Sequence, residues 1–93
     1  MSLELEQRRG AQARRLLEEP LLVEAFAAVE DSLRRQWEAS DDGEAGLRER
    51  LWLMLKLLRR VRALLIEVME TGHLAEAQLA AVEAVRKSEE EVR

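Results

Sequence analysis

Hydrophobic residues between Leu47 and Met69 recur at helical spacing and cover an unusually wide part of the helix surface. At about 100° per residue, nine of them share one stripe: Leu47, Leu51, Met54, Leu55, Leu58, Val61, Leu65, Val68 and Met69. Leu53, Leu57 and Leu64 widen the stripe along one flank, so the apolar arc spans roughly 200°, about twice that of an ordinary surface helix. We therefore expect a long central helix over residues 44–71 that is buried on two sides.

The segments that precede the central helix are also helical in pattern. Residues 3–19 predict a highly charged, weakly amphipathic helix with opposite charges four residues apart. Pro20 disfavours helical conformation in the residue before it and suits the first turn of a new helix, which predicts a break there. Residues 21–39 then place apolar side chains three and four apart, and residues 40–43 (Ser-Asp-Asp-Gly) predict a turn.

A glycine near the start of the C-terminal quarter of the chain predicts the end of a helix. Gly72 is typical of the left-handed residue that ends many helices, so we expect the central helix to stop near Thr71. A last helix is expected over residues 74–90, with a narrow, alanine-rich apolar face that can approach another backbone closely.

These elements predict an all-α fold: a small bundle of three to four helices around a long central hydrophobic helix. The 93 residues make one domain at most, spanning 1–93, and a chain this short buries only about 60–65% of its unfolded surface alone. Because the expected arc is too wide for three short helices of one chain, we expect a homo-oligomer.

Charge and composition limit the classes of partner that the protein is expected to bind. The net charge of −4 is spread evenly, and no segment is a basic arm, which disfavours a simple electrostatic nucleic-acid binder. The chain has no cysteine, no hydrophobic run of the kind found in signal peptides, and no apolar run long enough to cross a membrane. We expect no membrane contact.

Candidate chemistry is sparse. His73 is the single histidine, and it follows the expected helix-ending glycine, where a capping or surface role is commoner than catalysis. Glu70 and His73 have the Glu-x-x-His spacing of bundle metal sites, but Gly72 lies between them and the chain has no second pair. We expect no catalytic, cofactor-binding or metal-ligating residue. The protein is therefore expected not to be an enzyme.

The candidate functional residues are therefore surface residues of the central helix. Arg62 is notable because a guanidinium near the middle of an apolar arc must snorkel, pair, or sit at a subunit boundary. Trp37 and Trp52 are expected to be covered by another segment of the same fold, and would be interface anchors if exposed. The interface candidates are Leu51, Trp52, Leu55, Leu58, Arg62 and Leu65, and the basic-patch candidates are Lys56, Arg59 and Arg60.

Several short stretches between residues 8 and 80 resemble a family of small, uncharacterised tailed-bacteriophage proteins. They are Leu16-Leu17-Glu18-Glu19-Pro20, Glu24-Ala25-Phe26, Trp37 before the acidic turn, Arg50-Leu51-Trp52, and Glu70-Thr71-Gly72-His73-Leu74-Ala75. The resemblance brings no catalytic residues. It implies a phage or prophage origin, a place among virion or assembly proteins, and a location in the host cytoplasm or in a virion.

Two hypotheses follow for the function. The first is a non-enzymatic phage structural or assembly protein that acts through helix–helix self-association. The second is a small regulatory adaptor that binds a phage or host protein, or nucleic acid, through the Arg59 to Arg62 surface.

Overall fold

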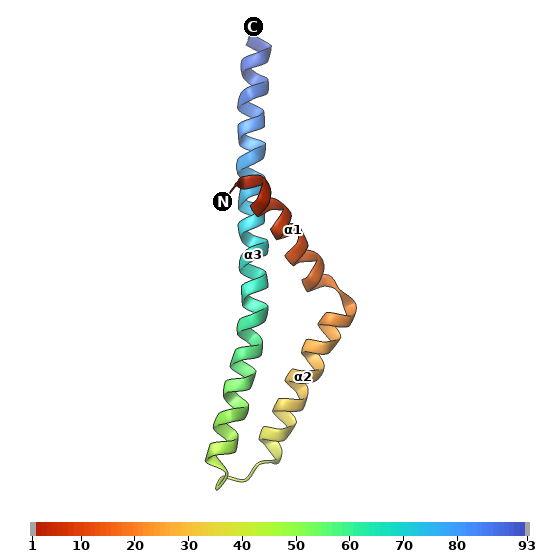
Figure 1. The fold of residues 1–93 in the computed structure, drawn as a ribbon, viewed down its shortest axis with the longest axis vertical. Coiled ribbons are helices and arrows are strands. Elements are labelled where there is room, and N and C mark those ends of the chain that lie inside the picture. The colour runs from red at the N-terminus through yellow and green to blue at the C-terminus, as the bar shows by residue number, and fades with distance from the viewer. Residues whose placement is uncertain (1, 93) are drawn as a thin grey trace. The chain divides into compact units, whose positions relative to one another are not determined.

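The computed structural model describes residues 2–92, which form three helices (Figure 1). Helix α1 spans Leu3–Glu18, α2 spans Pro20–Ala39 and α3 spans Ala45–Val92. No strand occurs among the described residues. The expected all-α class is confirmed.

The expected break at Pro20 is confirmed. Glu19 has an extended backbone, with φ −65° and ψ 116°, and Pro20 is the first residue of α2. The proline ring clashes with a helical conformation at the preceding residue, and its missing N–H is not needed in a first helical turn. The boundary between α1 and α2 therefore differs from the expected one by a single residue.

The expected turn after α2 is present as well. Both the backbone N–H and the hydroxyl of Ser40 donate to the carbonyl of Trp37, at 3.2 Å and 2.6 Å. The N–H of Glu44 donates to the carbonyl of Asp41 at 2.9 Å, and α3 begins at the next residue. These bonds satisfy backbone groups that the end of a helix leaves without partners.

The expected end of the central helix at Gly72 is wrong. Helix α3 runs without interruption for 48 residues, so the segments 44–71 and 74–90 are parts of one helix. Gly72 has no positive φ, the conformation that a helix-ending glycine normally adopts. A mid-helix glycine costs only about 1 kcal/mol relative to alanine, which contacts elsewhere can offset.

The backbone divides into two compact units, and each has its own helix pairing. The hairpin unit comprises residues 16–64. The crossing unit combines the chain up to residue 15 with the chain from residue 65 onward. The single domain expected from the length stays a prediction.

In the hairpin unit, α2 packs antiparallel against the first part of α3 (Figure 1). Leu33 and Leu51 are buried between them, at 6% and 4% exposed. Arg59 reaches from α3 to Glu30 of α2, with Nη2 and Oε1 3.0 Å apart. The apolar face of α2 predicted from spacings of three and four is therefore the face that contacts α3.

In the crossing unit, α1 packs on α3 through two glycines. A Cβ placed on Gly10 would lie 2.5 Å from the Cα of Gly72, and a Cβ on Gly72 would lie 2.6 Å from the Cα of Gly10. Ala13 and Ala75, each three residues after a glycine, are buried. Only residues without large side chains allow two helix backbones to approach this closely. The contact explains why glycines interrupt two otherwise strong helix-forming segments.

Candidate interaction surface

One face of α3 in the hairpin unit exposes five large hydrophobic side chains. We call it the open face, and it consists of Leu53, Met54, Leu57, Val61 and Leu64. The exposed fractions of these side chains range from 44% at Val61 to 66% at Leu57. Apolar patches of more than roughly a few hundred Å² commonly mark interaction sites on soluble proteins. The five exposed side chains lie on adjoining turns of α3, which makes this face a candidate interaction surface.

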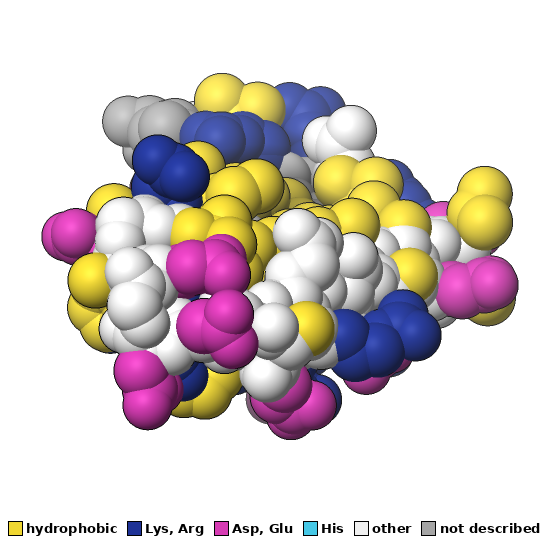
Figure 2. Space-filling model, turned by 90° about the horizontal axis from the view of Figure 1, so that it is seen from below, with side chains coloured by type: hydrophobic (Ala, Val, Ile, Leu, Met, Phe, Trp, Pro, Cys, Tyr) yellow, Lys and Arg dark blue, Asp and Glu magenta, His cyan; other side chains and the backbone are white. Residues whose placement is uncertain are grey.

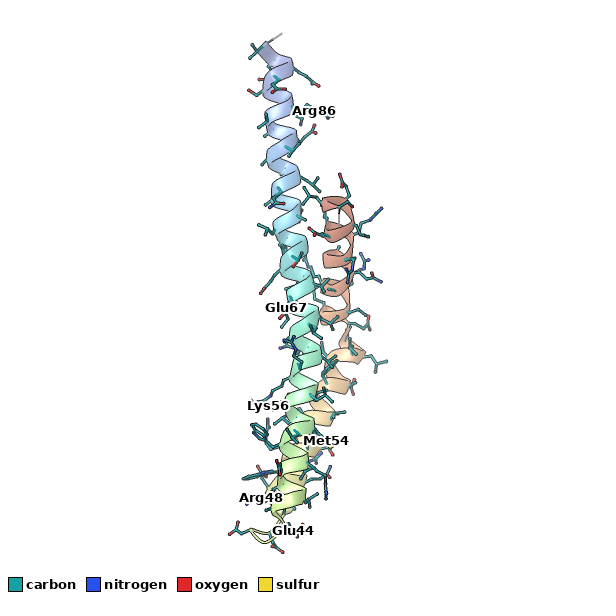
Figure 3. The ribbon with its side chains drawn as sticks, turned by 60° about the vertical axis from the view of Figure 1, so that its left-hand side comes forward. Glu44, Arg48, Met54, Lys56, Glu67 and Arg86 are labelled. Carbon is teal, nitrogen blue, oxygen red and sulfur yellow. The ribbon has the colours of Figure 1, made fainter. Side chains whose placement is uncertain are left out.

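The open face exists because α2 covers only one side of the wide apolar arc. Leu51 is buried and Leu55 and Leu58 are half-buried, and these three repeat at spacings of four and three toward α2. Leu53 and Leu57 lie about a third of a turn or more away from that row at 100° per residue. Met54, a member of the open face, and Lys56 project from different sides of α3 (Figure 3). The open face is thus a hydrophobic side of α3 next to the packed one.

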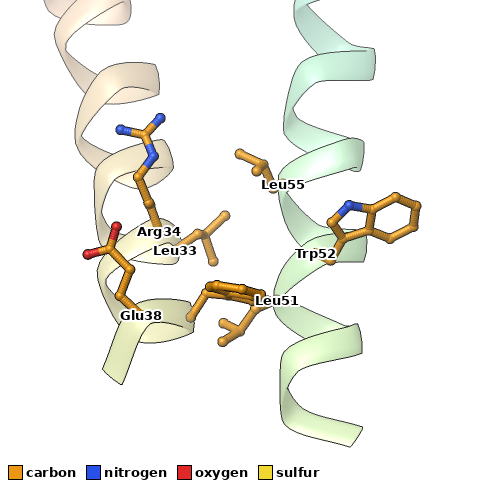
Figure 4. Close-up of a pocket in the computed structure, with 7 residues that line it drawn as sticks. Leu33, Arg34, Glu38, Leu51, Trp52 and Leu55 are labelled. Carbon is orange, nitrogen blue, oxygen red and sulfur yellow. The ribbon is translucent and has the colours of Figure 1, made fainter. Parts of the chain in front are cut away.

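A groove between α2 and α3 lies on the other side of the hairpin unit (Figure 4). Its volume is about 240 Å³, and the close-up shows Leu33 and Leu55 pointing toward one another across it. The groove is smaller than the roughly 300–1,000 Å³ of ordinary ligand pockets. The lining residues are Leu33, Arg34, Trp37, Glu38, Leu51, Trp52 and Leu55.

The two tryptophans are less covered than expected. Trp37 is 42% exposed and Trp52 is 51% exposed, so the expectation that other segments of the chain cover them is wrong. A cation lies over one face of each ring instead. The Arg48 guanidinium is 3.9 Å from the centre of the Trp37 ring, and the Lys56 ammonium is 4.6 Å from the centre of the Trp52 ring. Exposed cation–π contacts contribute about 0.5–1 kcal/mol each. Both indoles line the groove, and the Trp52 ring is turned away from α2 (Figure 4).

The six predicted interface residues fall into two groups, those that are packed within the chain and those that are exposed. Leu51, Leu55 and Leu58 lie on the side of α3 that faces α2, and Leu65, in the crossing unit, is half-buried. Trp52 and Arg62 are exposed. The residues at the centre of the arc are therefore largely used by the chain's own packing. The open face combines Leu53, Leu57 and Leu64 of the flank with Met54 and Val61 of the stripe, and none of the five was a predicted interface residue.

The basic cluster is partly engaged within the hairpin unit. Arg59 pairs with Glu30, and Lys56 lies over Trp52. Lys56, Arg59, Arg60 and Arg62 are all exposed. The contacts of Arg59 and Lys56 reduce the charge concentrated at any one point of the surface.

The histidine shows no arrangement of a reactive centre. His73 lies in the middle of α3, exposed, with its Nδ1 3.9 Å from a carboxylate oxygen of Glu76. Among the described residues, no three His, Cys, Asp or Glu side chains gather in a way that could hold a metal ion. In the same part of the chain, no helix is both long and apolar enough to cross a membrane.

The comparisons add no relative from which a role could be transferred. The chain matches no protein-family model, no curated protein and no solved structure.

Proposed function

We propose that this protein is a non-enzymatic structural or assembly protein of a bacteriophage or prophage, and that it acts by self-association of its helices. The phage origin rests on the sequence resemblance described above. The self-association rests on one structural observation, the open face of α3.

The small size of the core supports this proposal. Among the described residues, the buried hydrophobic side chains are Ala13, Leu33, Leu51 and Ala75, and no large side chain is fully buried. Burial of apolar surface contributes about 25 cal/mol per Å² and is the main favourable term in folding and association. A second copy on the open face would bury side chains that the single chain leaves in water.

Sedimentation velocity tests the proposal with two matched variants. Leu57→Glu places a charge on the open face at a side chain that is 66% exposed, and Leu74→Glu makes the same change at one that is 61% exposed and outside that face. We expect wild type and Leu74→Glu to sediment as species larger than a monomer at high concentration. Leu57→Glu should remain monomeric and folded.

A wild-type chain that sediments as a monomer across concentrations about a hundredfold apart would overturn the proposal. Equal association of the Leu57→Glu variant would show that the open face is not the contact.

A further inference from the structure

We infer that the hairpin unit pairs with that of a second copy as a closed dimer, in which the open face of α3 packs on an uncharged row of α2 from the other copy. This inference rests on the proposed self-association and names the surface that receives the open face. It follows from which rows of the two helices lie on the same side of the hairpin unit and from the sizes of their side chains.

One row of side chains along α2 carries no charge, and we call it the uncharged row. Its members follow one another at helical spacings of three and four. All of them are exposed except Ser32, which is half-buried. The charged residues of α2 occupy other rows around the helix. The uncharged row consists of Leu21, Ala25, Ala28, Ser32, Gln36 and Ala39.

The two polar side chains of the uncharged row bond to each other. The Nε2 of Gln36 donates to the hydroxyl oxygen of Ser32 at 3.2 Å. Burying a charge or an unpartnered polar group is costly, whereas a group that keeps its hydrogen bond can be covered at lower cost. A helix laid on this row would remove no charge from water and would leave the bond between Gln36 and Ser32 in place.

The uncharged row and the open face lie on the same side of the hairpin unit. On α3, Leu57 directly precedes Leu58, which faces α2. On α2, Ser32 directly precedes Leu33, which is buried against α3. Each row therefore lies one residue, or about 100°, before the row in contact. Because both helices are right-handed and run antiparallel, this step backwards turns toward the same side of the pair in both.

The groove supports this geometry from the opposite side. Arg34 and Trp52 come one residue after Leu33 and Leu51, and both line the groove. One step forward from the contact thus leads to the groove side on both helices (Figure 4). One step backward leads to the other side, where the open face and the uncharged row lie next to each other.

Large side chains of the open face lie level with small side chains of the uncharged row. The ion pair between Arg59 and Glu30, at 3.0 Å, places these two residues at about the same height in the hairpin unit. From this pair, heights are counted up one helix and down the other, because the helices are antiparallel. The level pairs are Leu57 with Ser32, Val61 with Ala28, and Leu64 with Ala25.

A twofold axis parallel to the helices would place α3 of each copy on α2 of the other. Rotation about such an axis leaves every residue at its own height, so each large side chain meets the small ones level with it. Large residues facing small ones fill the space between helices, and small residues let the backbones approach closely. Placing α3 on α3 would instead set large against large and, on α2, small against small. The same surface is used in both copies, so the contact closes at a dimer.

Charge borders this contact at the turn end. Arg50 continues the row of Leu57 and Met54 toward the turn, where its long side chain can extend to water past the last apolar contact. Seen from the turn end, hydrophobic side chains form a band that is bordered by charged ones (Figure 2). The apolar contact can therefore form without burying this arginine.

Two neighbouring alanines of α2 test the inference. Ala28 belongs to the uncharged row, whereas Ala27 is also exposed but lies outside it. Ala28→Arg should weaken association, measured by sedimentation velocity, about tenfold or more, because it places a bulky charge in the contact. Ala27→Arg makes the same change of size and charge beside it and should associate like wild type. Circular dichroism shows whether both variants fold.

Disulfide formation tests the arrangement without adding a charge. The chain has no cysteine of its own, so Ala28→Cys and Val61→Cys are single-cysteine variants. A disulfide needs Cβ atoms about 3.5–4.5 Å apart. On oxidation, an equimolar mixture should give a covalent dimer of one copy of each variant, and each variant alone should give little. Ala27→Cys mixed with Val61→Cys is the control and should remain without the crosslink.

Every other outcome counts against the inference. Wild-type association of a folded Ala28→Arg variant, a mixture that forms no crosslink, or preferred crosslinking of Val61→Cys to itself would overturn it and leave the proposed self-association standing. If Ala28→Arg does not fold, the disulfide experiment decides. A wild-type chain that is monomeric throughout would overturn both proposals.

Discussion

At the scale of single residues, the backbones of Gly10 and Gly72 approach so closely that neither position has room for a Cβ. A methyl group on Gly72 would meet the Cα of Gly10 at 2.6 Å and the carbonyl oxygen of Glu6 at 3.0 Å. Both obstacles are backbone atoms in helices, so they cannot rotate aside. We predict that Gly72→Ala lowers the free energy of unfolding by about 1–3 kcal/mol through overpacking, despite the better helix propensity of alanine.

Gly46→Ala is the matched control, because Gly46 also lies in α3 and nothing stands within 4 Å of a Cβ placed there. This change should be neutral or should stabilise the protein by up to about 1 kcal/mol. Denaturant unfolding followed by circular dichroism measures both variants. Equal stability of the two would show that the glycine contact does not hold the crossing unit together.

A second pair of residues separates the packed side of α3 from its open face. Leu51 is 4% exposed and Leu53 is 52% exposed, two residues apart on the same helix. Leu51→Ala should lower the free energy of unfolding by about 2–5 kcal/mol, because it removes buried atoms and leaves a cavity. Leu53→Ala should change it by less than about 0.5 kcal/mol in dilute solution.

The pair is measured by thermal melts at low protein concentration, where association contributes little. A Leu53→Ala variant as unstable as Leu51→Ala would mean that both sides of α3 are packed within one chain.

At the scale of helices, the last turns of α3 depend on few tertiary contacts. Val82, Val85 and Val92 are at least 60% exposed, and isolated helical segments of this length are marginal in water. We predict that amides of residues 82–92 exchange with solvent far faster than those of residues 66–75, which pack against α1 at Gly10. Hydrogen exchange followed by mass spectrometry measures this directly.

Slow exchange over residues 82–92 at high protein concentration, but not in dilute solution, would show that association covers this segment. Equal protection at every concentration would contradict the account of α3 as a helix whose end is held by few contacts.

The helices differ in how far their sequence predicted them. Pro20 and the Ser40 to Gly43 turn act through the local backbone, so the boundaries around them were predicted to within about a residue. Gly72 was misread because its role depends on Gly10, which is distant in sequence and packs against it only in the folded chain. The sequence signal that could have revealed this contact is an alanine three residues after each glycine, Ala13 after Gly10 and Ala75 after Gly72.

At the scale of the whole molecule, the width of the apolar arc could be predicted from the sequence. Which part of the arc is covered by α2 and which part stays exposed could not. Periodicity showed that α3 has more apolar surface than one neighbour covers. It did not show which part α2 covers, because that depends on how the two helices pack after the turn. The packing places Leu51 and Leu55 inside the hairpin unit and leaves Leu53 and Leu57 exposed.

The melting temperature of the wild-type chain at concentrations about a hundredfold apart tests the central claim, that the open face is covered by a second copy. Binding of a partner to the folded state stabilises it by mass action, so association raises the melting temperature as the protein becomes more concentrated. We predict a clear rise for wild type and none for Leu57→Glu. An identical melting temperature for wild type at both concentrations would contradict the account.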